Sequence, residues 1–181
     1  VQEYRLKTFQ AEEYKKNTNK MKFKGVTVHT FFVYDGFDLN PFPPQNRPWV
    51  KTGAKNSDGF TIYRTTAHID FIMPNWDVIR VPMGFEWDGS SIPLKKCFSW
   101  VWDADKHCKT ASLVHDALCQ LMREGELDKS YKAYIDGFYR DMCIAGWMGK
   151  FQAGIRFKGL RCAGQWGITK RKNPRDKIYT A

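Results

Sequence analysis

The feature that most constrains the fold is a change in hydrophobic period near residue 108. Upstream of it, apolar and polar residues nearly alternate, which is typical of half-buried strands. Downstream, apolar residues recur at helical spacing: Ala111, Val114, Leu118, Leu121 and Met122. Gly125 follows this run and predicts the C-terminus of an amphipathic helix. The pattern therefore predicts β-structure first and helices after it.

A second helical stripe follows after a short connection. Asp128 offers an N-cap side chain, and Gly146 marks the predicted end of the helix. The apolar positions between them are spaced i, i+3, i+4 and i+7: Tyr131, Tyr134, Ile135, Phe138 and Met142. Because the connection is short, the two helices are expected to form an αα-hairpin.

Three earlier segments are predicted as β-structure from their alternating β-branched and aromatic residues: 22–34, 59–73 and 76–87. Residues 149–168 are glycine-rich and also alternate, so this segment is predicted to be β or extended. The histidines within the strands, His29 and His68, are expected to be packing or surface residues.

Length and composition predict one domain with extended arms, and the order of the predicted elements makes it α+β. The chain has 181 residues, of which 43% are hydrophobic, enough for a single core. We predict an arm over 1–20 with a short helix near 10–16, and a basic tail over 167–181. The domain between them, 21–166, should pack an antiparallel sheet against the helical hairpin that carries a His-Asp pair. Its residues 37–58, with four of the eight prolines, predict a long loop insertion.

A net charge of +10, from 29 Lys and Arg against 19 Asp and Glu, favours an anionic partner. A phosphate-containing ligand, a lipid surface and nucleic acid all fit, and the plainer alternative is a solvated basic tail. The chain contains no uncharged apolar run long enough to span a membrane. Its N-terminus shows no apolar signal core, so secretion by that route is not expected.

Five cysteines are present, none in a C-x-x-C pair: Cys97, Cys108, Cys119, Cys143 and Cys162. Zinc ribbons and dithiol redox motifs therefore have no support. The first two of them could join His107 at a metal ion, but reduced cysteines of a cytoplasmic protein are the simpler interpretation.

Two ionisable residues, His115 and Asp116, stand side by side in the apolar run SLVHDALC, residues 112–119. Burying either group without a partner costs several kcal/mol. The pair is therefore satisfied by its neighbours or present for chemistry. His115 falls on the apolar face of the helix, whereas Asp116 is turned about 100° away, on the flank.

Across the expected hairpin, Asp136 lies at the margin of the second stripe, at a height comparable with His115. A carboxylate there could hold one imidazole nitrogen and leave the other as a general base. Asp116 would then be free to bind a metal ion. The alternative is that these three residues form a buried polar network that only fixes how the helices pack.

Upstream, the segment GFEWDGSSIP supplies Asp88, Ser90 and Ser91 in a glycine-flanked loop that can approach a helix closely. A serine nucleophile such as Ser91, activated by His115 and Asp136, is a candidate triad. The strand-Ser-helix elbow of hydrolases is absent, which favours a His-Asp site that activates water or holds a metal. In the packing-only alternative, Asp88 caps the helix or a turn, and Ser90 or Ser91 satisfies backbone groups.

Four segments in this order resemble DUF 1353, a phage-encoded family of unknown function. They are Val81–Pro93, Ala111–Asp116, Asp136 with Phe138, and Ile155–Gly159, spread over residues 78–160. The resemblance implies a phage origin, with the protein in the virion or the infected-host cytoplasm, and it implies no activity.

The helix pair is also similar to that of phospholipase A2. That resemblance implies that His115 activates water, Asp116 binds calcium and Asp136 orients the histidine. The glycine-rich calcium loop of that family has no clear counterpart here, and Cys119 stands where the family commonly has tyrosine.

Three function classes follow from these observations. The first is a phage accessory hydrolase that acts on a host or cell-envelope substrate, with His115 as base and a divalent cation held by Asp116 and Asp88. Oxygen ligands suit Ca²⁺ or Mg²⁺, and added histidines would suit Zn²⁺. The second is a binder of a small anionic host ligand, with Arg156, Arg161 and Ser90 as contacts. The third is a structural component of the phage particle that contacts other virion proteins.

Overall fold

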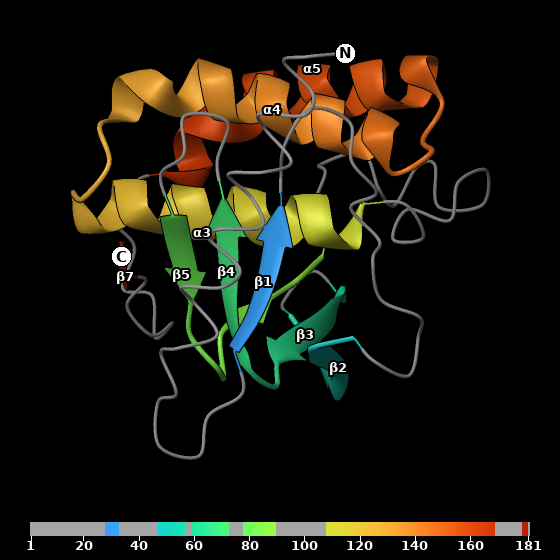
Figure 1. Ribbon diagram of the computed structural model, residues 1–181. Coiled ribbons are helices and arrows are strands. Elements are labelled where there is room, and N and C mark those ends of the chain that lie inside the picture. The colour runs from blue at the N-terminus through green and yellow to red at the C-terminus, as the bar shows by residue number, and fades with distance from the viewer. Residues whose placement is uncertain are drawn as a thin grey trace, which may run out of the picture.

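The computed structural model describes the following parts of the chain: 28–32, 47–56, 59–72, 78–89, 108–168 and 179–180. Within them the chain forms two small sheets and then three α-helices (Figure 1). The predicted α+β class is confirmed. None of the described helices is long and apolar enough to cross a bilayer.

The larger sheet has the strand order β1-β4-β5-β7. Its strands are β1 (Val28–Phe32), β4 (His68–Ile72), β5 (Val78–Val81) and β7 (Tyr179–Thr180). β4 runs antiparallel to β5, and β5 antiparallel to β7, but β1 pairs with β4 in parallel. The antiparallel pairing predicted from the sequence is present, and β1 adds one parallel pair to it. Across β4 and β5, the fully buried Asp70 accepts two hydrogen bonds from Arg80, both of 2.7 Å.

The smaller sheet is antiparallel, in the order β2-β3-β6. It consists of β2 (Trp49–Lys55), β3 (Thr61–Thr65) and β6 (Glu86–Trp87). β2 falls inside the predicted proline-rich loop, so that part of the loop prediction is wrong. The sequence of β2 shows no strand periodicity. The segment is a strand because it pairs with β3, for example through Val50 and Lys51.

Two predicted β segments each divide between the sheets. Residues 59–73 contain β3 and β4, and residues 76–87 contain β5 and β6. The points at which the two segments pass from one sheet to the other are hydrogen-bonded to each other through Thr65. Its carbonyl accepts from Gly84 N at 2.9 Å, and its hydroxyl donates to Pro82 O at 2.7 Å. Gly84 has φ +87°, a left-handed conformation that glycine adopts without strain. These contacts turn both chain segments at the same place.

The helices are α3 (Lys109–Glu124), α4 (Lys132–Ala145) and α5 (Lys150–Gly167), with a short 3₁₀ turn, η2 (Lys129–Tyr131), before α4. The predicted end of α3 at Gly125 is confirmed by its φ of +86° and its capping N–H. Asp128 caps η2 by accepting from Ser130 N at 2.7 Å. The β or extended prediction for 149–168 is wrong, because packing of α5 against α4 outweighs the low helix propensity of its glycines.

In Figure 1, α3 lies between the strands and an outer layer formed by α4 and α5. Twelve of the sixteen residues of α3 are buried, so the helix is covered on nearly all sides. α4 buries a face rotated from the predicted stripe: Ile135 and Met142 are inside, but Tyr131 and Tyr134 are 54% exposed. The central position of α3 and the rotated face of α4 together create the buried polar cluster described next.

Candidate acid-base site

His115 and Asp136 meet at the interface of α3 and α4. The Nε2 atom of His115 lies 2.9 Å from Oδ1 of Asp136, a hydrogen-bonding distance. Asp136 is fully buried and His115 is 7% exposed. The two residues are 21 positions apart in sequence, and the α3-η2-α4 connection brings them together. A buried carboxylate on one ring nitrogen fixes the imidazole orientation and leaves Nδ1 for another role.

Two further cations lie around the same carboxylate. Lys132, one helical turn before Asp136, is itself buried and donates from Nζ to Oδ1. Arg161 on α5 brings Nη1 to within 3.7 Å of Oδ2, and its side chain is 47% exposed. Asp136 therefore receives positive charge from its own helix, from α3 and from α5. This arrangement keeps the carboxylate ionised despite its burial.

The other side of the imidazole ring faces different groups. Asp116 Oδ1 lies 3.9 Å from Nδ1, and the sulfur of Cys119 lies 3.8 Å from the same atom. The Tyr139 ring meets the imidazole edge-on, with 5.3 Å between ring centroids. Nδ1 is therefore close to a carboxylate and a thiol, both beyond the usual range of a strong hydrogen bond.

The charges around His115 shift two pKa values in opposite directions. Burial by itself lowers the pKa of His115, but Cys119, Asp116 and Asp136 outweigh it and raise the pKa well above its ordinary 6.5. Burial by itself raises the pKa of Asp136, but hydrogen bonds from His115 and Lys132 outweigh it and lower the pKa below its ordinary 3.8. The site is thus built to hold an imidazolium against a carboxylate.

These shifts predict how stability depends on pH. The contribution of His115, whose folded pKa is raised, is complete below pH 6.5 and is lost as pH rises through the folded value. The contribution of Asp136, whose folded pKa is lowered, is complete above pH 3.8 and is lost as pH falls through the folded value. Urea unfolding should therefore show a maximum between these limits. His115→Gln should flatten the alkaline limb; an unchanged alkaline limb in that variant contradicts the assignment.

Arg156 occupies a second buried cluster, next to the first. It is 3% exposed, and its Nη1 donates to Cys108 Sγ at 3.3 Å and to Tyr139 Oη at 3.4 Å. Burial and a hydrogen bond to Cys108 raise the pKa of the neighbouring Cys143 thiol well above its ordinary value. Tyr139 links the two clusters, since its ring contacts His115. Arg156, predicted as a ligand contact, here uses these donors inside the protein.

Asp88, the predicted second metal ligand, follows β6, and its Oδ2 accepts a 2.8 Å hydrogen bond from Asn56 Nδ2. Ser90 and Ser91 lie outside the described residues, as do Cys97 and His107. The four cysteines in the described part, Cys108, Cys119, Cys143 and Cys162, are free thiols. The structure thus places three of the predicted site residues, His115, Asp116 and Asp136, in one cluster.

The described residues do not fit a divalent cation. Nowhere in that part of the chain do three His, Cys, Asp or Glu side chains gather as ligands. Ca²⁺ takes six to eight oxygen ligands and Mg²⁺ six. The divalent cation expected from the sequence therefore gains no support from Asp116 and Asp88, and no step below uses one.

Thermal unfolding tests the metal expectation directly. With EDTA and then with added Ca²⁺, Mg²⁺ or Zn²⁺, we expect the same Tm for the wild type in each case, because the described carboxylates are not gathered. An ion at one hundred times its Kd would add about 2.7 kcal/mol. A rise specific to one ion, absent from Asp116→Asn, would restore Asp116 as a ligand.

Sequence reasoning missed Lys132 and Tyr139 as members of the site. Lys132 could have been found, because it precedes Asp136 by four residues, the spacing at which helical side chains meet. Tyr139 also lies on the Asp136 face of α4, but the predicted apolar stripe contains its neighbour Phe138 and not Tyr139.

Comparisons with known proteins give a family and no activity. A family model described as a protein of unknown function (DUF1353) matches residues 63–158, just over half of the 181 residues. The matched region includes α3 and α4, and with them His115, Asp116 and Asp136. The family predicted from the sequence is thereby confirmed. Neither a curated protein nor a solved structure matches the chain.

Proposed function

We propose that this chain, which belongs to the DUF1353 family of proteins of unknown function, is a hydrolase in which His115 is the general base. One observation supports this most: a fully buried carboxylate, Asp136, lies 2.9 Å from Nε2 of His115. That hydrogen bond fixes the tautomer with a proton on Nε2, so Nδ1 is the basic nitrogen.

In this mechanism Nδ1 of His115 takes a proton from a water molecule, whose oxygen attacks the carbonyl or phosphorus of an ester. The imidazolium formed is stabilised by Asp136 on one side and Asp116 on the other. It then gives its proton to the departing alkoxide, so the base is regenerated. Lys132 holds Asp136 ionised and in place throughout.

Ser91 as an alternative nucleophile, with Ser90 beside it, belongs to the same proposal. His115 would take the proton of the Ser91 hydroxyl in place of that of water, and an acyl-enzyme would form. Replacing Ser91 with alanine separates the two routes, because only the serine route loses its nucleophile.

The test is a substrate panel of carboxylic esters, phospholipids, phosphodiesters and peptidoglycan fragments. The similarity to phospholipase A2 and the expectation of a phage accessory enzyme motivate this choice. The wild type should hydrolyse at least one class, and His115→Ala should lower kcat by roughly 10²–10⁴-fold, the range for loss of a general base. His68→Ala, at a histidine of β4 outside the site, is the matched control and should keep full activity.

The rate should also rise with pH through the raised pKa of His115, because only the neutral imidazole accepts a proton. Two outcomes oppose the proposal: no turnover of any class by the wild type, or full activity in His115→Ala.

A second candidate, capture of a small anionic host ligand, is favoured by the surplus of cations at the site. Three cations, Lys132, Arg161 and a protonated His115, lie around two carboxylates, Asp136 and Asp116, and Arg161 is half exposed. A phosphate group could pair with Arg161 without displacing the buried contacts. Calorimetric titration with nucleotides would then give binding without turnover, weakened in Arg161→Gln.

A phage origin, with the protein in the virion or the infected-host cytoplasm, accompanies either candidate as part of the proposal. A structural role in the particle would depend on the basic tail and the proline-rich loop, and most of that tail lies outside the described residues.

A further inference from the structure

The turn between α4 and α5 holds a tryptophan in a position that normally takes glycine. Trp147 N donates to Ile144 O and Met148 N donates to Cys143 O, both at 3.0 Å. These are the two hydrogen bonds of a Schellman helix cap, with Gly146 as the C-cap residue and Trp147 as the next residue. Trp147 has φ +70°, a left-handed conformation that is unfavourable for a bulky side chain.

The strained residue is also the most exposed large apolar side chain among the described residues. Trp147 is 83% exposed and Phe151, on the first turn of α5, is 79% exposed. Met148 between them is 4% exposed, so it anchors the turn in the core while the two rings project outwards. An exposed indole adds little to the stability of the folded chain, and strain retained at such a position is a reason to look for a function.

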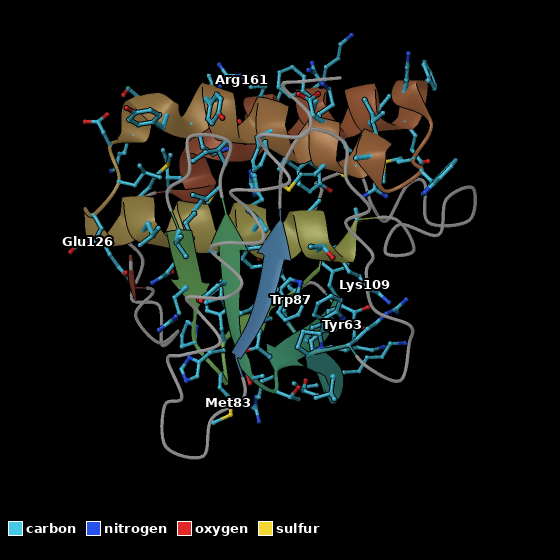
Figure 2. The ribbon with its side chains drawn as sticks, in the orientation of Figure 1. Tyr63, Met83, Trp87, Lys109, Glu126 and Arg161 are labelled. Carbon is cyan, nitrogen blue, oxygen red and sulfur yellow. The ribbon has the colours of Figure 1, made fainter. Side chains whose placement is uncertain are left out.

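Exposed positive charge lies beside this turn and further along α5. Residues 150–162 contain no Asp or Glu, and three of their four cationic side chains are exposed, Lys150, Lys158 and Arg161, whereas Arg156 is buried. Lys150, directly before Phe151, is exposed, as is Lys158 two turns later. α5 belongs to the outer helical layer, away from the sheets, and Arg161 is visible on that layer in Figure 2.

We propose that the α4–α5 turn docks the protein onto an anionic phospholipid bilayer, with Trp147 and Phe151 entering the headgroup boundary and Lys150 contacting lipid phosphates. Indole and phenyl rings beside lysine suit that boundary, where one end of a side chain is apolar and the other wet. Basic residues near an anionic leaflet add attraction. This proposal does not depend on the hydrolase proposal.

A bilayer fits these side chains better than single-stranded nucleic acid does. Bases stack on aromatic rings set along a positively charged groove that follows the nucleic-acid backbone. Exposed fractions of 83% and 79% mean that both rings project from the surface instead. Projecting rings can enter a lipid boundary without rearrangement.

Cosedimentation of the full chain with vesicles tests this. One set contains phosphatidylcholine alone and the other phosphatidylcholine with a quarter phosphatidylglycerol. The wild type should bind the anionic set, and Trp147→Gly with Phe151→Ala should lower the partition coefficient about tenfold or more. Lys150→Gln should lower it about fivefold. Met83→Ala removes a 52% exposed apolar side chain at the far end of the molecule from Arg161 (Figure 2) and should change nothing.

Trp147→Gly alone separates docking from folding, because glycine relieves the left-handed strain. Its thermal midpoint should equal or exceed that of the wild type while vesicle binding falls. The proposal is overturned if the anionic vesicles do not bind the wild type, or if the Trp147 and Phe151 variants bind them as well as the wild type does. A third result would also overturn it: the wild type binds an oligothymidine, added as a competitor, but does not bind the vesicles.

Discussion

Replacing Asp136 with alanine should lower the free energy of unfolding by about 3–5 kcal/mol, the range for breaking a buried ion pair. The change leaves two cationic partners, Lys132 and His115, in the interior without their carboxylate. Urea denaturation at neutral pH gives the value. Asp141→Ala is the matched control, because Asp141 lies on the same helix but is exposed and pairs with the exposed Arg140. It should change stability by less than about 0.5 kcal/mol.

A double variant shows where the loss comes from. In Asp136→Ala with Lys132→Met, the lysine that lost its carboxylate is removed as well, so part of the lost stability should return. Equal stability of the single and double variants would mean that the Lys132 side chain moves out to solvent when Asp136 is absent. A loss below about 1 kcal/mol in Asp136→Ala would mean that the buried ion pairs do not contribute to the packing of α3 against α4.

Replacing Trp87 with alanine should cost a similar amount, about 3–5 kcal/mol, for a different reason. Trp87 is fully buried where β6 meets α3, and Figure 2 shows it beside Tyr63. The two rings stack with centroids 5.4 Å apart, and Trp49 approaches edge-on at 6.1 Å. The indole N–H donates to Ser112 Oγ at 3.2 Å. Alanine therefore removes the largest fully buried side chain among the described residues.

Chemical denaturation measures this loss of stability, and two further variants serve for comparison. Trp87→Phe keeps most of the volume and removes the hydrogen bond, so it should cost about 1–2 kcal/mol. Met83→Ala, in the exposed turn before β6, should stay within about 0.5 kcal/mol of the wild type. If Trp87→Ala were as stable as Met83→Ala, the packing between sheet and helix described above would be wrong.

The end of α3 and the turn before α4 could be predicted because local signals agree there. Gly125 ends α3 in a left-handed conformation and Asp128 caps the following turn, both through contacts within a few residues. α5 could not be predicted in this way. Its glycines and alternating pattern favour an extended chain, and only packing against α4 selects the helix.

The division of the strands between two sheets could not be predicted, for a related reason. Apolar alternation runs continuously through residues 59–73, and nothing local shows that the first half belongs to one sheet and the second half to another. The division depends on Thr65, whose partners Pro82, Gly84 and Phe85 come from a later segment. Contacts between residues far apart in sequence therefore determine which sheet each strand joins, and the local pattern does not.

At the site, spacing was enough to suggest that His115 and Asp136 lie at the same height, but not how they are surrounded. The predicted stripe placed Tyr134 inside, whereas α4 is rotated so that Lys132, Asp136 and Tyr139 face the core. Arg156 was expected at a ligand and is buried against Cys108, which caps α3, and Tyr139 of α4. A buried arginine cannot be told from an exposed one until its partners on other helices are known.

The most direct test of the central claim is the titration of His115 by nitrogen-proton NMR of the imidazole ring, assigned by the loss of its signals in His115→Gln. We expect that Nε2 stays protonated at all pH values, held by Asp136, while Nδ1 loses its proton with a pKa above 6.5. Such a ring has a nitrogen that can accept a proton from water. If Nδ1 instead keeps its proton at every pH at which the protein is folded, or if Nε2 is the nitrogen that titrates, His115 cannot act as the proposed base and the cluster serves packing alone.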